Sequence, residues 1–177
     1  MENDRERLIE AFASLIAEVP FESISAKMIT ERAGLPASSF AYEFSDIYAI
    51  ADAYLEAEVE AVKSADIHPE SGGEAFILTA SAAFRSPDSA KNLCRSSAAG
   101  IYRRRVSDLA TKYFSELVMR RLNGAEPGDR ERDAVRFLRA AAVGIATKEL
   151  IAADDPAAAA RRFAETFDLA ADALIGE

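Results

Sequence analysis

The chain has 177 residues, of which half are hydrophobic, with a formal net charge of −9 and an isoelectric point near 4.8. This length and composition allow a proper hydrophobic core, formed as one unit or as a small and a larger lobe. The acidic balance means that the overall field of the protein does not attract it to nucleic-acid phosphate or to anionic membranes.

The single cysteine, Cys94, excludes an internal disulfide and fits a reducing compartment. No apolar run approaches the roughly 20 residues that a membrane span needs. The N-terminus is charged and is not followed by the apolar core of a signal peptide. We therefore expect a cytoplasmic protein that does not bind membranes.

Helical periodicity begins near the N-terminus, where apolar residues recur at helical spacing over residues 8–19 and stop at Pro20. A short helix is expected over about 25–33 and another over about 36–43, with Gly34 in the turn between them. Two short helices joined by a glycine turn form a helix–turn–helix, which presents one helix end to a DNA groove.

The remainder also has helical patterning, without a clear alternating strand pattern. The loop at residues 66–73, with its His-Pro and Gly-Gly pairs, is a soft boundary. Asp155 should cap the last helix, and Pro156 suits the first position of that helix, where no backbone N–H is needed. The helices expected after the helix–turn–helix span about 46–64, 74–84, 88–97, 100–122, 129–152 and 156–175. The sequence thus predicts an all-α protein of about nine helices.

Residues 5–54 resemble the tetracycline-repressor (TetR/AcrR) family of bacterial transcriptional regulators. The matching stretch reads Ile29-Thr30-Glu31-Arg32-Ala33-Gly34-Leu35, then Pro36-Ala37-Ser38-Ser39-Phe40, with Phe44 following. The family usually has IA-x-x-AGV here, then a small or basic pair, G-T-L-Y and a late F. The end of the chain, FLRAAAVGIATKELIAADDPAAAARRFAETFDLAADALI, resembles the dimerising helix pair of the family around a DDP turn. No motif supports residues 66–125, where the family is variable.

The resemblance implies a helix–turn–helix DNA-binding lobe in residues 1–50 and a helical regulatory and dimerisation lobe in residues 51–177. The apolar residues of the motif are expected to form the core of the small lobe: Phe12, Ile16, Phe21, Ile29, Leu35, Phe40 and Phe44. Small side chains in the groove can touch thymine methyls, and hydroxyls can contact bases or phosphate. The residues expected to contact DNA are Ser25, Lys27, Pro36, Ala37, Ser38, Ser39 and Tyr42.

The charges argue against DNA binding. Residues 1–63 hold five basic and thirteen acidic side chains, a net charge of −8, whereas residues 64–177 hold 16 basic and 17 acidic ones. A DNA-binding lobe normally has the opposite asymmetry. Ala37 stands where the family commonly has a basic residue, and Ile47 where a lysine grips phosphate. With two or three usable cations per protomer, a dimer would have a salt slope of about −4 to −5.

Carboxylates that lie on solvated helix faces, away from the groove, would not oppose DNA binding, and many of these carboxylates can lie there. Glu43 and Asp46, however, lie beside the expected recognition surface. The lobe is therefore divergent and acidic for this family. The affinity for operator DNA is the doubtful part of the assignment.

In this family the middle helices enclose an apolar cavity, and its ligand shifts the spacing of the two DNA-reading lobes, a two-state coupling. The residues expected to line a cavity for a small hydrophobic ligand are Phe76, Phe84, Tyr102, Tyr113, Phe114, Leu117 and Phe137. Ordinary core packing is the alternative for each of them. Tyr102 and Tyr113 are the best candidates, because a phenol can orient a ligand while its ring stays buried.

Two helix pairs with small residues at helical spacing can form a four-helix seam between protomers. The residues expected at this homodimer interface are Phe137, Leu138, Ala141, Ile145, Phe163, Phe167 and Leu174. The core of a single protomer would need the same residues. The assignment of these residues to a dimer interface therefore rests on the family resemblance.

An enzyme is the least supported class. With one histidine, His68, and one cysteine, the chain has no metal-ligand spacing, and it lacks a glycine-rich phosphate loop and a nucleophile elbow. We expect no catalytic residue, metal or cofactor. The first hypothesis is a ligand-responsive dimeric repressor that binds operator DNA. The second is a TetR-fold protein that has lost DNA binding and acts through a small-molecule or protein partner.

Overall fold

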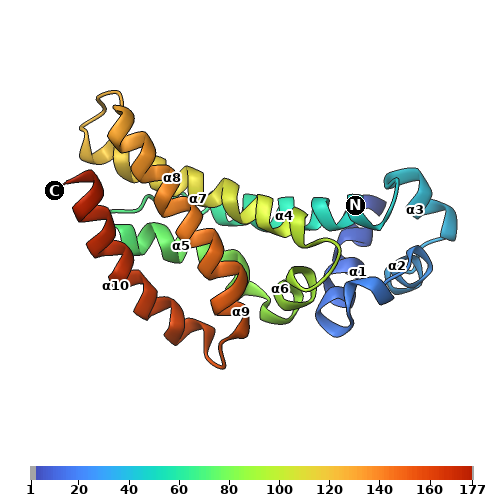
Figure 1. Ribbon diagram of the computed structural model, residues 1–177. Coiled ribbons are helices and arrows are strands. Elements are labelled where there is room, and N and C mark those ends of the chain that lie inside the picture. Colours follow the sequence, from blue (N-terminus) through green and yellow to red (C-terminus); the bar gives the residue numbers. More distant parts are fainter. Residues whose placement is uncertain (1–2, 177) are drawn as a thin grey trace. The chain divides into compact units, whose positions relative to one another are not determined.

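The computed structural model describes residues 3–176 except for the side chains of residues 82–85, and every regular element in this part of the chain is helical (Figure 1). The elements are α1 (Asp4–Glu18), η1 (Phe21–Ser23), α2 (Ala26–Ala33), α3 (Ala37–Glu43), α4 (Ile47–Lys63), α5 (Gly72–Arg85), α6 (Pro87–Cys94), α7 (Ala99–Arg121), α8 (Asp129–Gly144), η2 (Ile145–Glu149), α9 (Leu150–Ala152) and α10 (Pro156–Ile175). The predicted all-α class is confirmed.

The stretch from α8 through η2 to α9 is one continuous helix that widens into a π-helical segment at η2, where the Leu150 amide donates to the Ile145 carbonyl. Counted as one, it brings the described residues to nine helices besides the short 3₁₀ turn η1, as predicted. None of the helices in the described residues combines the length and the apolar character that crossing a bilayer requires.

The chain divides into two compact units, which we call the first and the second unit. The first comprises Met1–Glu60 and Ser86–Tyr102, and the second comprises Ala61–Arg85 and Arg103–Glu177. The helix α6 thus belongs to the same unit as the helix–turn–helix, although it follows α5 in sequence. The predicted division at residue 50, into a DNA-binding lobe and a regulatory and dimerisation lobe, concerns function and remains a prediction.

The core of the first unit forms where α1 packs against α2, α3 and α6. Phe12 lies at its centre, with ring centroids 6.4 Å from Phe21 and 5.7 Å from Tyr54. All the predicted core residues of this lobe are buried except Leu35, which is half-buried. Leu35 follows the turn glycine and so lies at the edge of the core.

In the second unit, α5 lies along α10, and α8 packs against both. A Cβ atom on Gly72 would lie 2.2 Å from the Phe167 carbonyl oxygen, and the Gly73 amide donates to Asp168 Oδ1 at 2.6 Å. The expectation that α5 starts at about residue 74, after a glycine-containing loop, was therefore wrong by two residues. The two glycines form the first turn of α5, because only glycine lets that turn approach α10 so closely.

The helix α6 ends at Cys94, three residues before the end predicted for it. The Ser96 hydroxyl donates to the Leu93 carbonyl at 2.8 Å and accepts from the Ala98 amide at 3.0 Å. A serine side chain that satisfies backbone groups in this way favours a turn over another helical residue.

Candidate functional site

The turn between α2 and α3 is built as the sequence predicts. The Ser25 hydroxyl caps α2 by accepting from the Met28 amide at 3.3 Å. Gly34 ends the helix in the left-handed region with φ +65°, and the Leu35 amide donates to the Thr30 carbonyl at 2.9 Å. This is a Schellman motif, which stops α2 sharply and redirects the chain into α3.

The helix α3 has a buried face and an exposed face. Phe40 and Phe44 are buried, with ring centroids 5.8 Å apart. Ser38 and Tyr42 are exposed one turn apart, and the Tyr42 side chain is 89% accessible. Pro36 and Ala37 are exposed as well, whereas Ser39 is half-buried. Four of the five residues predicted to face the groove from α3 are thus available on the surface of the first unit.

Two arginines of α1 hold the C-terminal ends of the helix–turn–helix. Arg7 Nη2 donates to the Ala33 carbonyl at 2.6 Å, at the last residue of α2. Arg5 Nη1 donates to the Glu43 carbonyl at 3.2 Å, at the end of α3, and its guanidinium lies 4.5 Å from the Phe44 ring centroid. A cation at a helix C-terminus satisfies unpaired carbonyls and interacts favourably with the helix dipole. The α1 helix thereby fixes both short helices.

Arg32 attaches α2 to α1. Its two terminal nitrogens each lie 2.8 Å from an oxygen of the Glu18 carboxylate, and Nη1 also donates to the Ser14 hydroxyl. The hydrogen bond from Arg32 holds the pKa of Glu18 below its ordinary value, and Glu18 raises the pKa of Arg32. The sequence analysis missed the roles of these arginines, because their partners lie 14 to 38 residues away.

Residues 3–60 hold four basic side chains, and Lys27 is the one that remains besides the three arginines. It is 80% exposed, and its ammonium lies 3.7 Å from Glu31 one turn along α2. Such an exposed pair binds weakly and leaves the ammonium able to meet a phosphate. Three of the four cations in this region therefore serve the fold, and Lys27 is the one placed on the open surface of α2.

Acidic side chains also have fixed roles in the first unit. Asp46 Oδ1 accepts from the Ala49 amide at 2.8 Å and so caps the N-terminus of α4. Glu22 accepts from the Ser97 amide at 2.9 Å, which is the main reason its pKa is lowered. A carboxylate at the start of α4 occupies an amide that would otherwise attract an anion. Glu43, which was expected beside the recognition surface, is half-buried.

In the second unit, residues predicted for the ligand cavity and for the dimer interface meet in one aromatic cluster. The Phe76 ring stacks on Phe167 with centroids 4.5 Å apart, and Phe114 lies 5.6 Å from Phe167. Phe163 completes the cluster at 6.3 Å from Phe76. Leu117 is buried in the same unit, and the Phe84 side chain lies outside the described residues.

The two predicted ligand-binding tyrosines are both fully buried, Tyr102 in the first unit and Tyr113 in the second. Neither hydroxyl has a hydrogen-bond partner among the described residues. Burial is the main cause that raises the pKa of each phenol, so both stay neutral. A buried hydroxyl without a partner carries a desolvation cost that a bound ligand or water can relieve.

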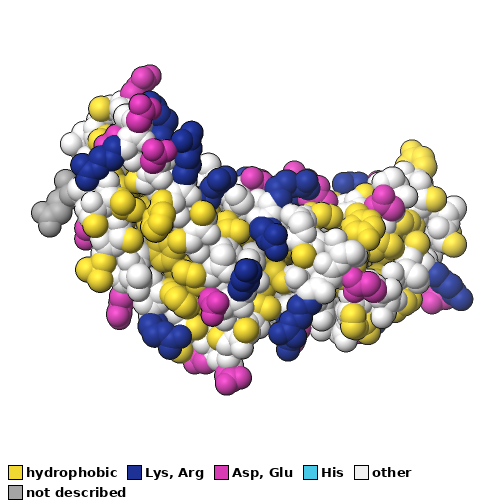
Figure 2. All heavy atoms as spheres, in the orientation of Figure 1, with side chains coloured by type: hydrophobic (Ala, Val, Ile, Leu, Met, Phe, Trp, Pro, Cys, Tyr) yellow, Lys and Arg dark blue, Asp and Glu magenta, His cyan; other side chains and the backbone are white. Residues whose placement is uncertain are grey.

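Part of the predicted dimer surface is exposed. Phe137 on α8 is 60% accessible, and Leu169 on α10, which the sequence did not single out, is 73% accessible. Within the second unit, hydrophobic side chains gather over α8 and α10 (Figure 2). Ala141, Ile145 and Leu174 are half-buried, whereas Leu138 is buried inside the protomer. Of the seven predicted residues, Phe137 is therefore exposed, four are half-buried, and Leu138 and Phe167 are buried.

No protein-family model matches the chain, and no curated protein matches it. Two solved structures resemble it over nearly their whole length. One is the TetR family repressor AlkX from Dietzia sp. strain DQ12-45-1b, implicated in the biodegradation of n-alkanes, with a TM-score of 0.58, 16% identity, and coverage of 97% of this chain and 96% of that one. The other is GusR of Salmonella enterica, with a TM-score of 0.62, 17% identity, and coverage of 97% and 95%. The chain therefore has the fold of the TetR family of regulators.

Proposed function

We propose that this protein is a dimeric, ligand-responsive transcriptional repressor of the cytoplasm that binds operator DNA through α3. The observation that carries the proposal is the TetR-like fold over 97% of the chain, together with an exposed α3 face. The helix α3 would enter the major groove, with Ser38 and Tyr42 toward the base edges and Ala37 against thymine methyls. Ser25 and Lys27 would meet phosphates beside it.

Dimerisation would use the exposed face of α8 and α10. Phe137 and Leu169 supply apolar surface there, and the exposed alanines of α10, such as Ala158, allow another helix to approach closely. A dimer places two α3 helices on one DNA, which a palindromic operator would match.

Ligand response would operate through the buried tyrosines. The unpaired hydroxyl of Tyr113 is suited to orient a small hydrophobic ligand that enters among the helices of the second unit. Such a ligand would release the repressor only if it binds the DNA-free state better than the DNA-bound state.

A second candidate function follows from the charge of the first unit. A TetR-fold protein that has lost DNA binding would need no cations on α2 and α3, and three of the four basic side chains in residues 3–60 hold the lobe together instead. Such a protein would act through a small-molecule or protein partner.

Selection of bound fragments from a sheared genomic library at about 50 mM salt, where phosphate contacts count most, separates the two. If the protein is a repressor, a palindromic site should be enriched. The Lys27→Glu and Tyr42→Ala variants should abolish this enrichment, while their circular dichroism spectra stay unchanged. Lys91→Glu on α6 is the matched charge control, and Tyr42→Phe tests the hydroxyl separately. Absence of any enriched site, from a folded dimer, would overturn the repressor proposal and favour the second candidate.

A further inference from the structure

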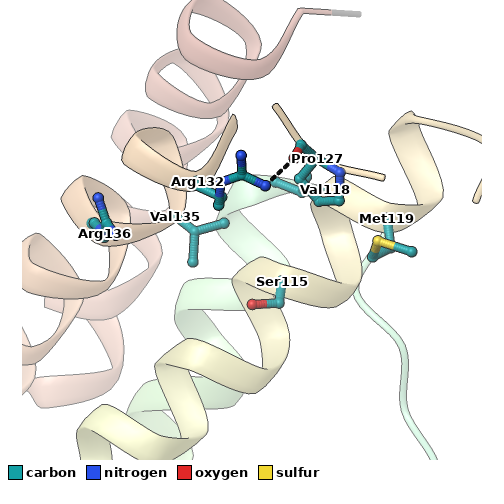
Figure 3. Close-up of a pocket in the computed structure, with 7 residues that line it drawn as sticks. All are labelled: Ser115, Val118, Met119, Pro127, Arg132, Val135 and Arg136. Atoms are coloured by element: carbon teal, nitrogen blue, oxygen red, sulfur yellow. Dashed lines mark hydrogen bonds between the residues drawn. The ribbon is translucent and has the colours of Figure 1, made fainter. Parts of the chain in front are cut away.

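A surface hollow of about 280 Å³ lies in the second unit between the C-terminal part of α7 and the N-terminal part of α8 (Figure 3). Its walls are the side chains of Ser115, Val118, Met119, Pro127, Arg132, Val135 and Arg136. For comparison, an apolar protein cavity of about 150 Å³ holds a benzene molecule. The hollow is thus large enough for a small organic molecule and belongs to none of the residue sets predicted from the sequence.

The wall combines an apolar surface with two cations. Val118, Val135 and Met119 supply the apolar part, and the thioether of Met119 adapts to ligands of different shape. Arg132 and Arg136 lie one turn apart on α8, and both residues line the hollow. Figure 3 shows Arg132 extending from α8 toward Pro127, above Val135.

Arg132 is held in position by the protein. It donates to the Pro127 carbonyl and, at 2.9 Å, to Asp129 Oδ1. Arg136 donates to Asp133 Oδ1 at 2.8 Å. Both aspartates precede their arginine by three residues and are exposed, so a ligand carboxylate can bind the donor positions that they leave open. A guanidinium that is already positioned loses little freedom when it binds a carboxylate.

The charge around the hollow permits an anion, although the whole chain is acidic. Residues 61–85 and 103–177, which form the second unit, hold 15 basic and 16 acidic side chains, so this unit lacks the strong negative field of the first. An apolar wall bordered by two cations matches a molecule with an apolar chain and one negative end.

We propose that this hollow binds a small amphiphilic anion, an apolar chain that ends in a carboxylate. The chain lies against Val118, Val135 and Met119, and the carboxylate accepts from Arg132 and Arg136. This site is separate from the buried tyrosines and does not depend on whether the protein binds DNA.

Calorimetric titration of the full chain with octanoate tests the proposal. We expect saturable binding of one octanoate per protomer, with a dissociation constant on the order of 1 mM or lower for a ligand of this size. Octanol, which has the chain without the charge, and acetate, which has the charge without the chain, should each bind at least tenfold more weakly.

Variants assign the binding to the hollow. Arg132→Gln combined with Arg136→Gln should weaken octanoate binding at least tenfold. Arg130→Gln, on the same helix outside the hollow, should leave it unchanged. Asp133→Asn frees Arg136 and should tighten binding about twofold, a gain that damage to the fold cannot produce.

Three results would overturn the proposal. The first is no saturable heat with octanoate up to about ten times the expected constant. The second is octanol bound as tightly as octanoate. The third is octanoate affinity that the double arginine variant leaves intact, because octanoate would then bind elsewhere.

Discussion

The helices of the two compact units are held together by different combinations of contacts. In the first unit, Arg5, Arg7 and Arg32 attach α1 to the ends and flank of the helix–turn–helix. In the second unit, Arg121 of α7 likewise donates to the Gly176 carbonyl at the end of α10 at 2.9 Å, and the helices also meet through stacked phenylalanines and through the close approach of Gly72 to α10. A small lobe buries little apolar surface, so hydrogen bonds from charged side chains to helix ends matter more there.

The difference affects recognition of DNA. A cation that holds a helix end is less available to neutralise phosphate, and phosphate contacts supply most non-specific affinity. The first unit therefore has a helix–turn–helix of ordinary construction with few cations on its surface. The account predicts that mutations of the arginines change folding, whereas mutations of Lys27 and Tyr42 change DNA binding.

The largest effect is expected in the aromatic cluster of the second unit. Phe167→Ala should lower the free energy of unfolding by about 3–5 kcal/mol, because it empties the space between Phe76 and Phe114. Urea unfolding followed by circular dichroism measures it. Thr166→Ala, exposed on the same helix, should stay within about 0.5 kcal/mol. Similar losses for both variants would show that α10 does not pack through Phe167.

The next effect concerns the glycine contact. Gly72→Ala should cost about 1–3 kcal/mol, because its Cβ would lie 2.2 Å from the Phe167 carbonyl oxygen. Gly144→Ala in α8 should instead leave stability unchanged or raise it by up to about 1 kcal/mol, since a Cβ there meets nothing within 4 Å. Thermal unfolding of the two variants compares them directly, and a stabilising Gly72→Ala would refute the close approach.

In the first unit, Arg7→Gln should lower the free energy of unfolding by about 1 kcal/mol, because the Ala33 carbonyl at the end of α2 loses its charged donor. Lys27→Gln should change stability by less than about 0.5 kcal/mol, since its ion pair is exposed. Chemical denaturation of both variants tests the division of roles. A larger loss for Lys27→Gln would reverse it.

The smallest effect is a change in acid stability. Because Arg32 lowers the folded-state pKa of Glu18 from its ordinary 4.5, the pair stabilises the fold above that pH, and the contribution is lost as the pH falls through the lowered value. The free energy of unfolding, measured between about pH 3 and pH 6, should therefore fall less steeply in Arg32→Gln than in the wild type. Parallel curves would mean that the pair contributes nothing.

Local features of the fold could be predicted from the sequence. The Ser25 cap, the left-handed Gly34 and the Asp155 cap each depend on residues within a few positions, and all three are confirmed. The exposed face of α3 followed from the spacing of Phe40 and Phe44. These features are predictable because helical periodicity and capping act over one or two turns.

Contacts between distant segments could not be predicted in this way. The sequence does not show that Arg7 reaches a carbonyl 26 residues away, or that Gly72 lies against α10. A Gly-Gly pair indicates a loop unless the neighbouring helix is known. The hollow beside Arg132 likewise depends on how α7 and α8 meet. The predicted ligand and dimer residues are still predictions, since their roles depend on molecules outside the chain.

The salt dependence of operator affinity tests the central claim most directly. The sequence suggested two or three usable cations per protomer, but the structure engages Arg5, Arg7 and Arg32 within the fold. If only Lys27 of each protomer neutralises phosphate, a dimer makes about two such contacts, and the logarithm of the affinity should fall with the logarithm of the salt concentration with a slope of about −2 rather than −4 to −5. A slope of about −5 or steeper would contradict the account, because Arg5, Arg7 and Arg32 would then serve DNA rather than the fold.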